Sequence, residues 1–250
     1  MLLDQRRDQI LQHAQEHGYV SLGQLVAHLG VSESTIRRDL EALDQAGQIR
    51  RTRGGIAYVG ESLPALETRV TRAHLEKQRI AKAVAAMIQP GESILLDAGS
   101  TTLEIARQLH KMELQVLTTY LPIVNLLHSA PNIELIFIGG YIHPKTDVAL
   151  GPIVTQTLKG LHVRKAIMSA GGLTSRGLFN SNTLLVDAQR MMIEASEEVI
   201  VALDSHKLGH TELVNLCPLD DIDRLVTDDA VDPQWVQMLE QQNIAVTIAR

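Results

Sequence analysis

The sequence predicts an α/β chain in two parts: a small helical segment that ends in a hairpin, then a larger, mostly parallel sheet covered by helices. Residues 1–57 show apolar residues at helical spacing, followed by two short β-type runs around a Gly-Gly pair. From residue 91 onward, short apolar runs alternate with helical segments, which is typical of buried parallel strands. With 250 residues, the chain is long enough for two modest domains.

The composition is ordinary for a globular protein, with 45% hydrophobic and 21% charged residues. No apolar run approaches the roughly 18 to 20 residues that span a bilayer. The opening "MLLDQRRDQILQHAQ" has no apolar centre of the kind a signal peptide needs. The single cysteine, Cys217, excludes an internal disulfide framework and favours an inert side chain over a reactive thiol. We therefore expect a cytoplasmic protein with no membrane partner.

The front segment predicts three helices. The first ends at Gly18, the second runs from its cap Ser21 to Gly30, and the third begins at its cap Ser32. Two short helices joined by a tight glycine turn, after a first helix, form a helix-turn-helix. The apolar residues that predict the buried faces are Ile10, Leu11 and Ala14, then Leu22, Leu25, Val26 and Leu29, and finally Ile36, Leu40 and Leu43.

The outward face of the third helix predicts contacts with DNA, because the second helix of such a pair enters the major groove. Ser34, Thr35, Arg37 and Arg38 lie off the apolar stripe. Hydroxyls and arginines donate to phosphate oxygens, and arginine can bind the edge of guanine with two hydrogen bonds. The alternative is a solvated face on which the arginines pair with acids of residues 39–44.

The next stretch, "QIRRTRGGIAYV", predicts a strand, a Gly-Gly turn and a second strand. Such a hairpin beside a recognition helix is a wing, so the front segment is predicted to be a winged helix-turn-helix. The whole chain has a net charge of −6, but residues 1–57 hold seven arginines and seven acids, so the wing arginines are a local positive feature. The residues predicted to contact DNA are Ser32, Ser34, Thr35, Arg37, Arg38, Arg50, Arg51, Arg53, Gly54 and Gly55.

The second part alternates strands and helices. Parallel strands of this kind bind ligands beyond their carboxyl ends. The expected strands are 93–97, 114–119, 133–140, 164–172, 198–204, 223–228 and 244–249, and the expected helices include 102–109, 121–130, 183–195 and 233–242.

Polar residues gather where those strands end. The first strand leads into "DAGSTT", in which a glycine permits close approach and hydroxyls join the free N–H groups of a starting helix, a combination that attracts phosphate. The lysine of a Walker A loop is missing, so nucleotide hydrolysis is disfavoured; simple helix capping is the alternative. The residues predicted to bind a phosphorylated polar effector are Asp97, Gly99, Ser100, Thr101, Thr102, Thr118, Thr119, Tyr120, Gly139, Gly140, Gly171, Gly172, Asp204 and Lys207.

The stretch "TIRRDLEALDQAGQIRRTRGG" resembles the signature of the DeoR family of bacterial transcription regulators, although Arg53 and Ile56 stand where that family has histidine and alanine. "ETRVTRAHLEKQRIAKA" is similar to the family's segment before the sensor domain. The sensor motif D-x-G-[ST]-T-T matches residues 97–102, and the Gly-Gly after the third strand and Gly151 in "ALGP" match as well. Residues 204–209 resemble D-S-S-K-[FIL]-G with His206 at the second serine, and Thr119 stands where asparagine is usual.

This resemblance covers nearly the whole chain and implies a sensor domain similar to ribose-5-phosphate isomerase. The competing hypothesis is therefore a sugar-phosphate isomerase-like enzyme that carries a DNA-binding domain, with Asp97, Asp187 or Asp204 as its base. A metal site at His206 and His210 is disfavoured, because Gly209 interrupts any regular helix between them. We expect no catalysis, no metal and no cofactor.

The sequence thus predicts a winged helix-turn-helix at 1–57, a linker at 58–74 and a Rossmann-like, mostly parallel α/β sensor and oligomerisation domain at 75–250. The resemblance implies a transcriptional regulator, in most members of the family a repressor, of a carbohydrate-utilisation operon. Its partners would be double-stranded operator DNA and a phosphorylated sugar as effector. Because one recognition helix reads only a few base pairs, a homodimer or homotetramer is expected.

Overall fold

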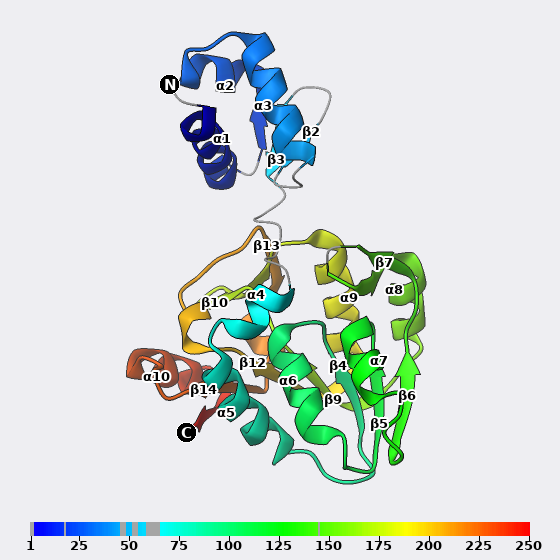
Figure 1. The fold of residues 1–250 in the computed structure, drawn as a ribbon. Helices are drawn as coiled ribbons and strands as arrows, with labels where there is room; N and C mark the ends of the chain where they lie inside the picture. Colours follow the sequence, from blue (N-terminus) through cyan, green and yellow to red (C-terminus); the bar gives the residue numbers. More distant parts are fainter. Residues whose placement is uncertain (1–2, 18, 46–48, 52–54, 59–65, 145) are drawn as a thin grey trace. The chain divides into compact units, whose positions relative to one another are not determined.

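The computed structural model describes residues 3–17, 19–45, 49–51, 55–58, 66–144 and 146–250. The chain divides into two compact units, Met1–Leu63 and Pro64–Arg250 (Figure 1).

The first unit is a winged helix-turn-helix, as predicted. A small antiparallel sheet of order β1-β3-β2 joins the wing to a short strand that the sequence did not predict. Its elements are α1 (Leu3–His17), β1 (Tyr19–Ser21), α2 (Leu22–Leu29), α3 (Glu33–Gln45), β2 (Ile49–Arg51) and β3 (Gly55–Tyr58).

The predicted caps of α2 and α3 are confirmed. Ser21 and Gln24 form a capping box at the start of α2, and Gly30 ends that helix with a left-handed φ of 64°. The Ser32 hydroxyl accepts from the Thr35 N–H at 3.3 Å, which satisfies one free donor at the start of α3. Gly18, the predicted end of α1, lies outside the described residues.

The apolar stripe predicted for α3 is buried. Ile36 is fully enclosed, and Leu40 and Leu43 are each 4% exposed. They form one core with residues of α1, α2 and the small sheet: Ile10, Ala14, Val20, Leu25, Leu29, Ile49 and Ile56. This packing fixes which side of α3 faces outward.

The second unit is built on a seven-stranded sheet of order β15-β14-β12-β9-β4-β5-β6. All of its neighbouring strands pair in parallel, as predicted. The helices and strands from the start of the unit to the last sheet strand are α4 (Leu66–Thr71), α5 (His74–Ala85), β4 (Ser93–Leu96), α6 (Ser100–Leu109), β5 (Leu114–Thr118), α7 (Leu121–Leu127), β6 (Ile133–Phe137), β7 (Tyr141–His143), β8 (Val148–Leu150), α8 (Pro152–Lys159), β9 (Val163–Met168), β10 (Gly172–Thr174), β11 (Gly177–Asn180), α9 (Thr183–Glu194), β12 (Ser196–Ala202), β13 (Val214–Cys217), β14 (Arg224–Asp228), α10 (Pro233–Gln241) and β15 (Ala245–Ala249).

The direction in which the chain crosses this sheet reverses between β4 and β9. From β4 the chain moves outward to β5 and β6, then returns to β9 on the other side of β4. Figure 1 shows α6 between α5 and α7, and α8 packs against α9, which covers β9 and β12. Sheets of this type bind ligands at the carboxyl ends of the strands beside the reversal.

Several short elements were not predicted. Helix α4 lies within the predicted linker, the β7–β8 hairpin and α8 follow β6, and β10, β11 and β13 form a separate antiparallel sheet. The turn between α4 and α5 contains Ala73, whose φ of 51° is in the left-handed region that disfavours side chains with a Cβ.

The core of the second unit runs along both faces of the sheet and includes Cys217, whose thiol is 4% exposed. Burial raises the pKa of that thiol to about 12, so it stays protonated and unreactive. Within the described parts of the chain, no helix combines the length and apolar character needed to cross a membrane.

Candidate DNA-binding and effector-binding sites

The outer face of α3 carries the predicted DNA-contacting residues. Ser34, Arg37 and Arg38 are exposed, and Thr35 is half-buried. The Ser32 hydroxyl lies 2.9 Å from that of Ser34 and 2.8 Å from that of Thr35, so the three form a small polar group at the start of the helix. This face presents hydroxyl and guanidinium donors to solvent.

The two adjacent arginines differ in their surroundings. Arg37 Nη2 lies 2.5 Å from Glu33 Oε1 one turn back, and both side chains are more than half exposed. Such exposed pairs contribute only about 0.3 to 0.5 kcal/mol. Arg38 forms no ion pair with any residue that the structure describes.

Asp39 is a structural residue that the sequence analysis missed. Its side chain is 2% exposed and accepts from Arg6 Nε at 2.6 Å and Arg7 Nε at 3.3 Å. The alternative in which an α3 arginine pairs with Asp39 is therefore wrong, because α1 already occupies this carboxylate. The sequence signal for its burial was its position three residues after buried Ile36, which places both side chains on the same face of the helix.

A hydrogen bond from the backbone of the wing holds the wing against α3. The Arg51 N–H donates to Asp44 Oδ1 at 3.1 Å, and the Arg51 side chain is exposed. At Gly55 a Cβ would come within 2.2 Å of the Val20 carbonyl oxygen, so this glycine is required by the close pairing of β3 with β1. Of the other predicted wing residues, Arg53 and Gly54 lie outside the described residues, and only the backbone of Arg50 is described.

In the second unit, Asp97 lies where β4 ends at the reversal of the sheet. Its carboxylate is fully buried, and Oδ2 accepts from Gln189 Nε2 at 2.7 Å and the Ser169 N–H at 3.2 Å. Gln189 in turn accepts from Asn180 Nδ2 at 3.1 Å. This network joins the ends of β4 and β9 to α9, and only Asp97 among its members was predicted.

Burial raises the pKa of Asp97 from 3.8 to about 6, against the opposing effects of the Gln189 amide, the Ala98 and Ser169 N–H groups and the Lys207 charge. The folded state therefore binds this proton more tightly than the unfolded state. The stability that the proton confers is fully present below about pH 4 and is lost as the pH rises through about 6. A shift of this size corresponds to about 3 kcal/mol.

We therefore expect Asp97→Asn, which carries no charge at any pH, to lose this dependence. Relative to the wild type, its free energy of unfolding should rise by about 3 kcal/mol between about pH 4 and about pH 7 in urea titrations. Asp187→Asn is the control, because Asp187 is exposed on α9. An equal pH dependence in the Asp97→Asn variant and the wild type would contradict burial of a charged carboxylate here.

The predicted hydroxyl residues divide into two groups. Thr102 Oγ1 donates to the Gly99 carbonyl at 3.1 Å and Thr118 Oγ1 donates to the Leu96 carbonyl at 2.8 Å, so these two hold the local backbone. Thr101 and Thr119 are at most 1% exposed, and their hydroxyls find no hydrogen-bond partner among the described residues. Buried polar atoms are nearly always bonded, so these two hydroxyls have free capacity at the strand ends.

Lys207 approaches the same edge from the loop after β12. Its Nζ donates to the Ala170 carbonyl at 2.8 Å. Lys207 ends a short 3-10 helix, Ser205–Lys207, and Asp204, 5% exposed, comes directly before that helix. Burial lowers the pKa of Lys207, and the Asp204 charge raises it again. The strand ends thus combine free hydroxyls with a cation.

The predicted glycines have packing roles of their own. A Cβ at Gly171 would come within 2.5 Å of the Glu212 side chain, and one at Gly172 within 2.2 Å of the His210 carbonyl oxygen. Both positions therefore need glycine, because a side chain would clash with the loop that follows Lys207. A Cβ at Gly140 would come within 2.9 Å of the Leu150 carbonyl oxygen, and one at Gly139 within 3.7 Å of the Phe137 ring.

Tyr120 is fully buried, and its position brings another unpredicted residue into the site. Burial raises the pKa of its hydroxyl, and Arg69 of α4 lies close enough to oppose that rise. Lys77 of α5 also lies near this edge and is 4% exposed. The sequence signal for the burial of Lys77 was its place on the same helix stripe as the apolar residues Ile80 and Val84.

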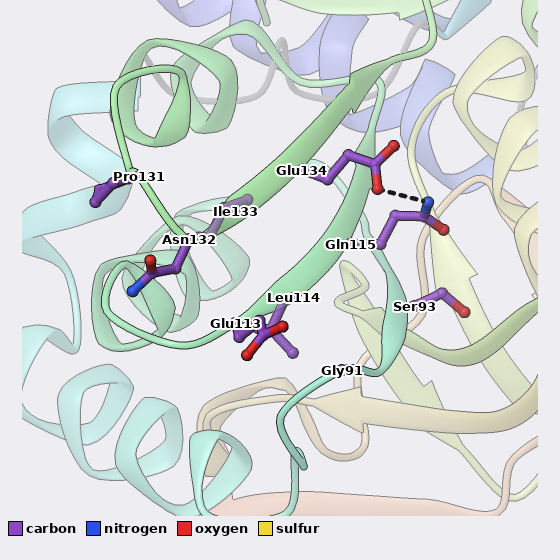
Figure 2. A pocket seen from close by; sticks show the side chains of 9 residues that line it. All are labelled: Gly91, Ser93, Glu113, Leu114, Gln115, Pro131, Asn132, Ile133 and Glu134. Carbon is purple, nitrogen blue, oxygen red and sulfur yellow. Dashed lines mark hydrogen bonds between the residues drawn. The ribbon is translucent and has the colours of Figure 1, made fainter.

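A hollow of about 810 Å³ lies at the opposite, amino ends of β4, β5 and β6 (Figure 2). Gln115 there donates to Glu134 at 3.1 Å, and Glu113 adds a second carboxylate to the lining. Two acids and no lysine or arginine among its lining residues make this hollow unfavourable for a phosphorylated ligand.

The aspartates of the competing isomerase hypothesis divide between surface and site. Asp187 is exposed on α9, whereas Asp97 and Asp204 are buried and both lie within electrostatic reach of Lys207. His206 lies 3.5 Å from Asp204 Oδ1 through its Nδ1, and no group of three metal-ligating side chains occurs within the described ranges.

Comparison with known proteins covers both units. Residues 6–61 match the family described as "DeoR-like helix-turn-helix domain", and residues 72–229 match "DeoR C terminal sensor domain". Relatives named "HTH-type transcriptional regulator UlaR" from Escherichia coli (strain K12 / DH10B) and Shigella boydii serotype 18 (strain CDC 3083-94 / BS512) are each 29% identical over 246 residues, 97% of this chain and 97% of theirs.

Solved structures with a partly similar fold include ribose 5-phosphate isomerase A from Methanocaldococcus jannaschii, with TM-score 0.40, 17% identity and coverage of 54% of this chain and 55% of that one. Another is eIF2B delta from Chaetomium thermophilum, with TM-score 0.43, 14% identity and coverage of 72% and 57%. Because the sensor-domain match alone spans more than half of the 250 residues and the helix-turn-helix match spans the first unit, the chain belongs to the DeoR family of transcriptional regulators.

Proposed function

We propose that this regulator represses a carbohydrate-utilisation operon and that a phosphorylated sugar, bound at the carboxyl ends of the strands, relieves the repression. The winged helix binds operator DNA in the cytoplasm through α3 and the wing. A ligand shifts such an equilibrium only by its differential affinity for the two forms, so the sugar must bind the DNA-free form more tightly.

The observation that carries the effector proposal is the pair of unbonded, buried hydroxyls of Thr101 and Thr119 at the same sheet edge as Lys207. Free hydroxyls bind the hydroxyl groups of a sugar, and a lysine with the start of α6 attracts a phosphate group. The chemistry of these residues fits a ligand that is both hydroxylated and anionic.

Thermal unfolding with a panel of pentose and hexose phosphates tests this proposal. A sugar phosphate present at 100 times its Kd should stabilise the fold by about 2.7 kcal/mol and raise the Tm by roughly 5 °C or more. The same compound should release operator DNA selected from random duplexes, and Lys207→Met should abolish both effects. Equal effects from unphosphorylated sugars would contradict a phosphate site.

The isomerase-like alternative retains one supporting observation, the raised pKa of Asp97, because bases that move protons near neutral pH have such values. Gln189 and the Ser169 N–H both donate to Asp97 Oδ2, which favours a structural role for that oxygen, whereas Oδ1 finds no partner among the described residues. Turnover of ribose 5-phosphate by the purified chain, abolished by Asp97→Asn, would favour the enzyme instead.

We also propose that the protein acts as a homodimer or homotetramer, because one recognition helix reads too few base pairs for a specific site. The edge strand β6 and the β7–α8 region support pairing with a second copy of the chain. Sedimentation velocity should show an oligomer that Phe137→Glu weakens, and a monomeric wild type would contradict this. Of the nine large hydrophobic residues that are exposed in the described parts of the chain, five lie in this region: Ile136, Phe137, Tyr141, Ile142 and Ile153.

A further inference from the structure

Helix α4 is the first element of the second unit, and only residues 59–65 separate it along the chain from β3 of the wing. Its last turn is held by Lys77, whose Nζ donates to the carbonyls of Arg69 and Arg72, each at 2.5 Å. Helix α4 also packs against α6, the helix that begins with the Ser100 and Thr101 hydroxyls (Figure 1). It therefore packs against the helix that opens the predicted effector site and, along the chain, directly follows the residues that lead to the DNA-binding unit.

Positive charge gathers around this contact. Burial and, to a smaller extent, the charges of Lys207, Arg69 and Arg72 lower the pKa of Lys77 to about 8, against the opposing charge of Asp204. Arg69 and Arg72 act in the same direction on Lys207, against the carboxylates Asp204 and Glu212. These four basic side chains interact with three acids, Asp97, Asp204 and Glu212, so one positive charge is in excess, and a bound anion would relieve it.

There is also space for such an anion. A cavity of about 410 Å³ opens at the α4–α5 turn, and its lining includes Arg72, His74 and His206 together with one acid, Glu76. His206 is the residue before Lys207, so this cavity adjoins the loop that carries the predicted effector-binding lysine.

We propose that Arg69 and Arg72 extend the effector site onto α4, so that a bound phosphate group ties this helix to the Lys207 loop and thereby fixes the segment leading to the DNA-binding unit. The inference rests on the proposed effector function and adds its route of regulation. It extends the site for the phosphate end of the effector from Lys207 and the start of α6 to the α4–α5 turn, and leaves the hydroxyl end at Thr101 and Thr119.

Hydrogen exchange of the full chain, with inorganic phosphate as the probe and chloride at equal ionic strength as the reference, tests this. Phosphate should slow exchange several-fold in peptides covering residues 66–72 and 204–209 of the wild type. The double variant Arg69→Gln/Arg72→Gln should lose the protection at 66–72, and Arg69→Lys/Arg72→Lys should keep it. Arg107→Gln, which removes an exposed arginine from the far end of α6, is the matched control and should behave as the wild type.

The outcomes separate the two proposals. Protection at 204–209 that depends on Lys207, with no change at 66–72, would overturn the role of α4 and leave the effector site standing. Protection at neither segment would overturn both. If the glutamine variant unfolds at a lower temperature without phosphate, its loss of protection could come from instability, and the lysine variant is then the test. Loss of protection at 66–72 in the folded lysine variant would also overturn the inference.

Discussion

Arg38→Ala is expected to reduce affinity for operator DNA by roughly 5- to 150-fold, which corresponds to about 1 to 3 kcal/mol for one lost bidentate base contact. The residue is exposed on the outer face of α3 and forms no ion pair with the described residues, so its removal leaves the fold intact. Arg37→Ala should have a smaller or similar effect, because Arg37 must first give up Glu33. The double variant Arg37→Ala/Arg38→Ala should lose several kcal/mol of binding free energy at most.

Gel-shift titrations check this with DNA duplexes that the wild-type protein selects from a random pool. The salt dependence of the measured affinity distinguishes base contacts from phosphate contacts. Loss of a base contact relaxes preference at one position, whereas loss of a phosphate contact weakens all sequences and lowers the salt slope by about 1. Arg107→Ala removes the same charge from the other unit and serves as control. Unchanged affinity in both α3 variants would show that α3 is not the recognition helix.

Asp39→Ala is expected to destabilise the first unit by about 2 to 3 kcal/mol, less than the 3 to 5 kcal/mol for a fully buried pair because both arginines keep some contact with water. Removal of the carboxylate leaves Arg6 and Arg7, 12% and 31% exposed, without their shared partner. In a unit this small, that is a large share of the total stability. Operator binding should fall because α3 loses its tie to α1.

The two units can be followed separately, because the single tryptophan, Trp235, belongs to the second unit. Urea titration of Asp39→Ala should show an early loss of helical circular dichroism while tryptophan fluorescence keeps the wild-type midpoint. Glu41→Ala removes an exposed acid from the same helix and should unfold like the wild type. A wild-type curve for Asp39→Ala would mean that the Arg6 and Arg7 contacts contribute nothing to stability.

The sequence predicted structure best where a regular spacing of apolar residues coincided with a residue of known structural role, such as a helix cap. The α3 stripe and its Ser32 cap predicted both the helix and its outward face, and apolar runs predicted all seven strands of the parallel sheet. The three-residue strands β1, β7, β8 and β10 are too short to show a period, so their pairing depends on tertiary contacts.

The site was predictable only in part for a similar reason. Strand ends can be found in a sequence, which placed Asp97 and the hydroxyl residues at one edge. Gln189 and Lys77 reach the same edge from helices α9 and α5, 92 residues after and 20 residues before Asp97 along the chain. Nothing local distinguishes a glutamine that bonds a distant carboxylate from one that faces water.

The left-handed alanine at the α4–α5 turn has a thermodynamic consequence. An alanine in this region is less stable by about 1 to 2 kcal/mol than in its preferred backbone conformations, a factor of roughly 5 to 30 in population. The φ of 51° at Ala73 is therefore imposed by its surroundings, in which Lys77 bonds the carbonyls on both sides of Thr71. Loss of the contacts around Lys77 would therefore favour relaxation of the Ala73 backbone, and with it a change in the angle between α4 and α5.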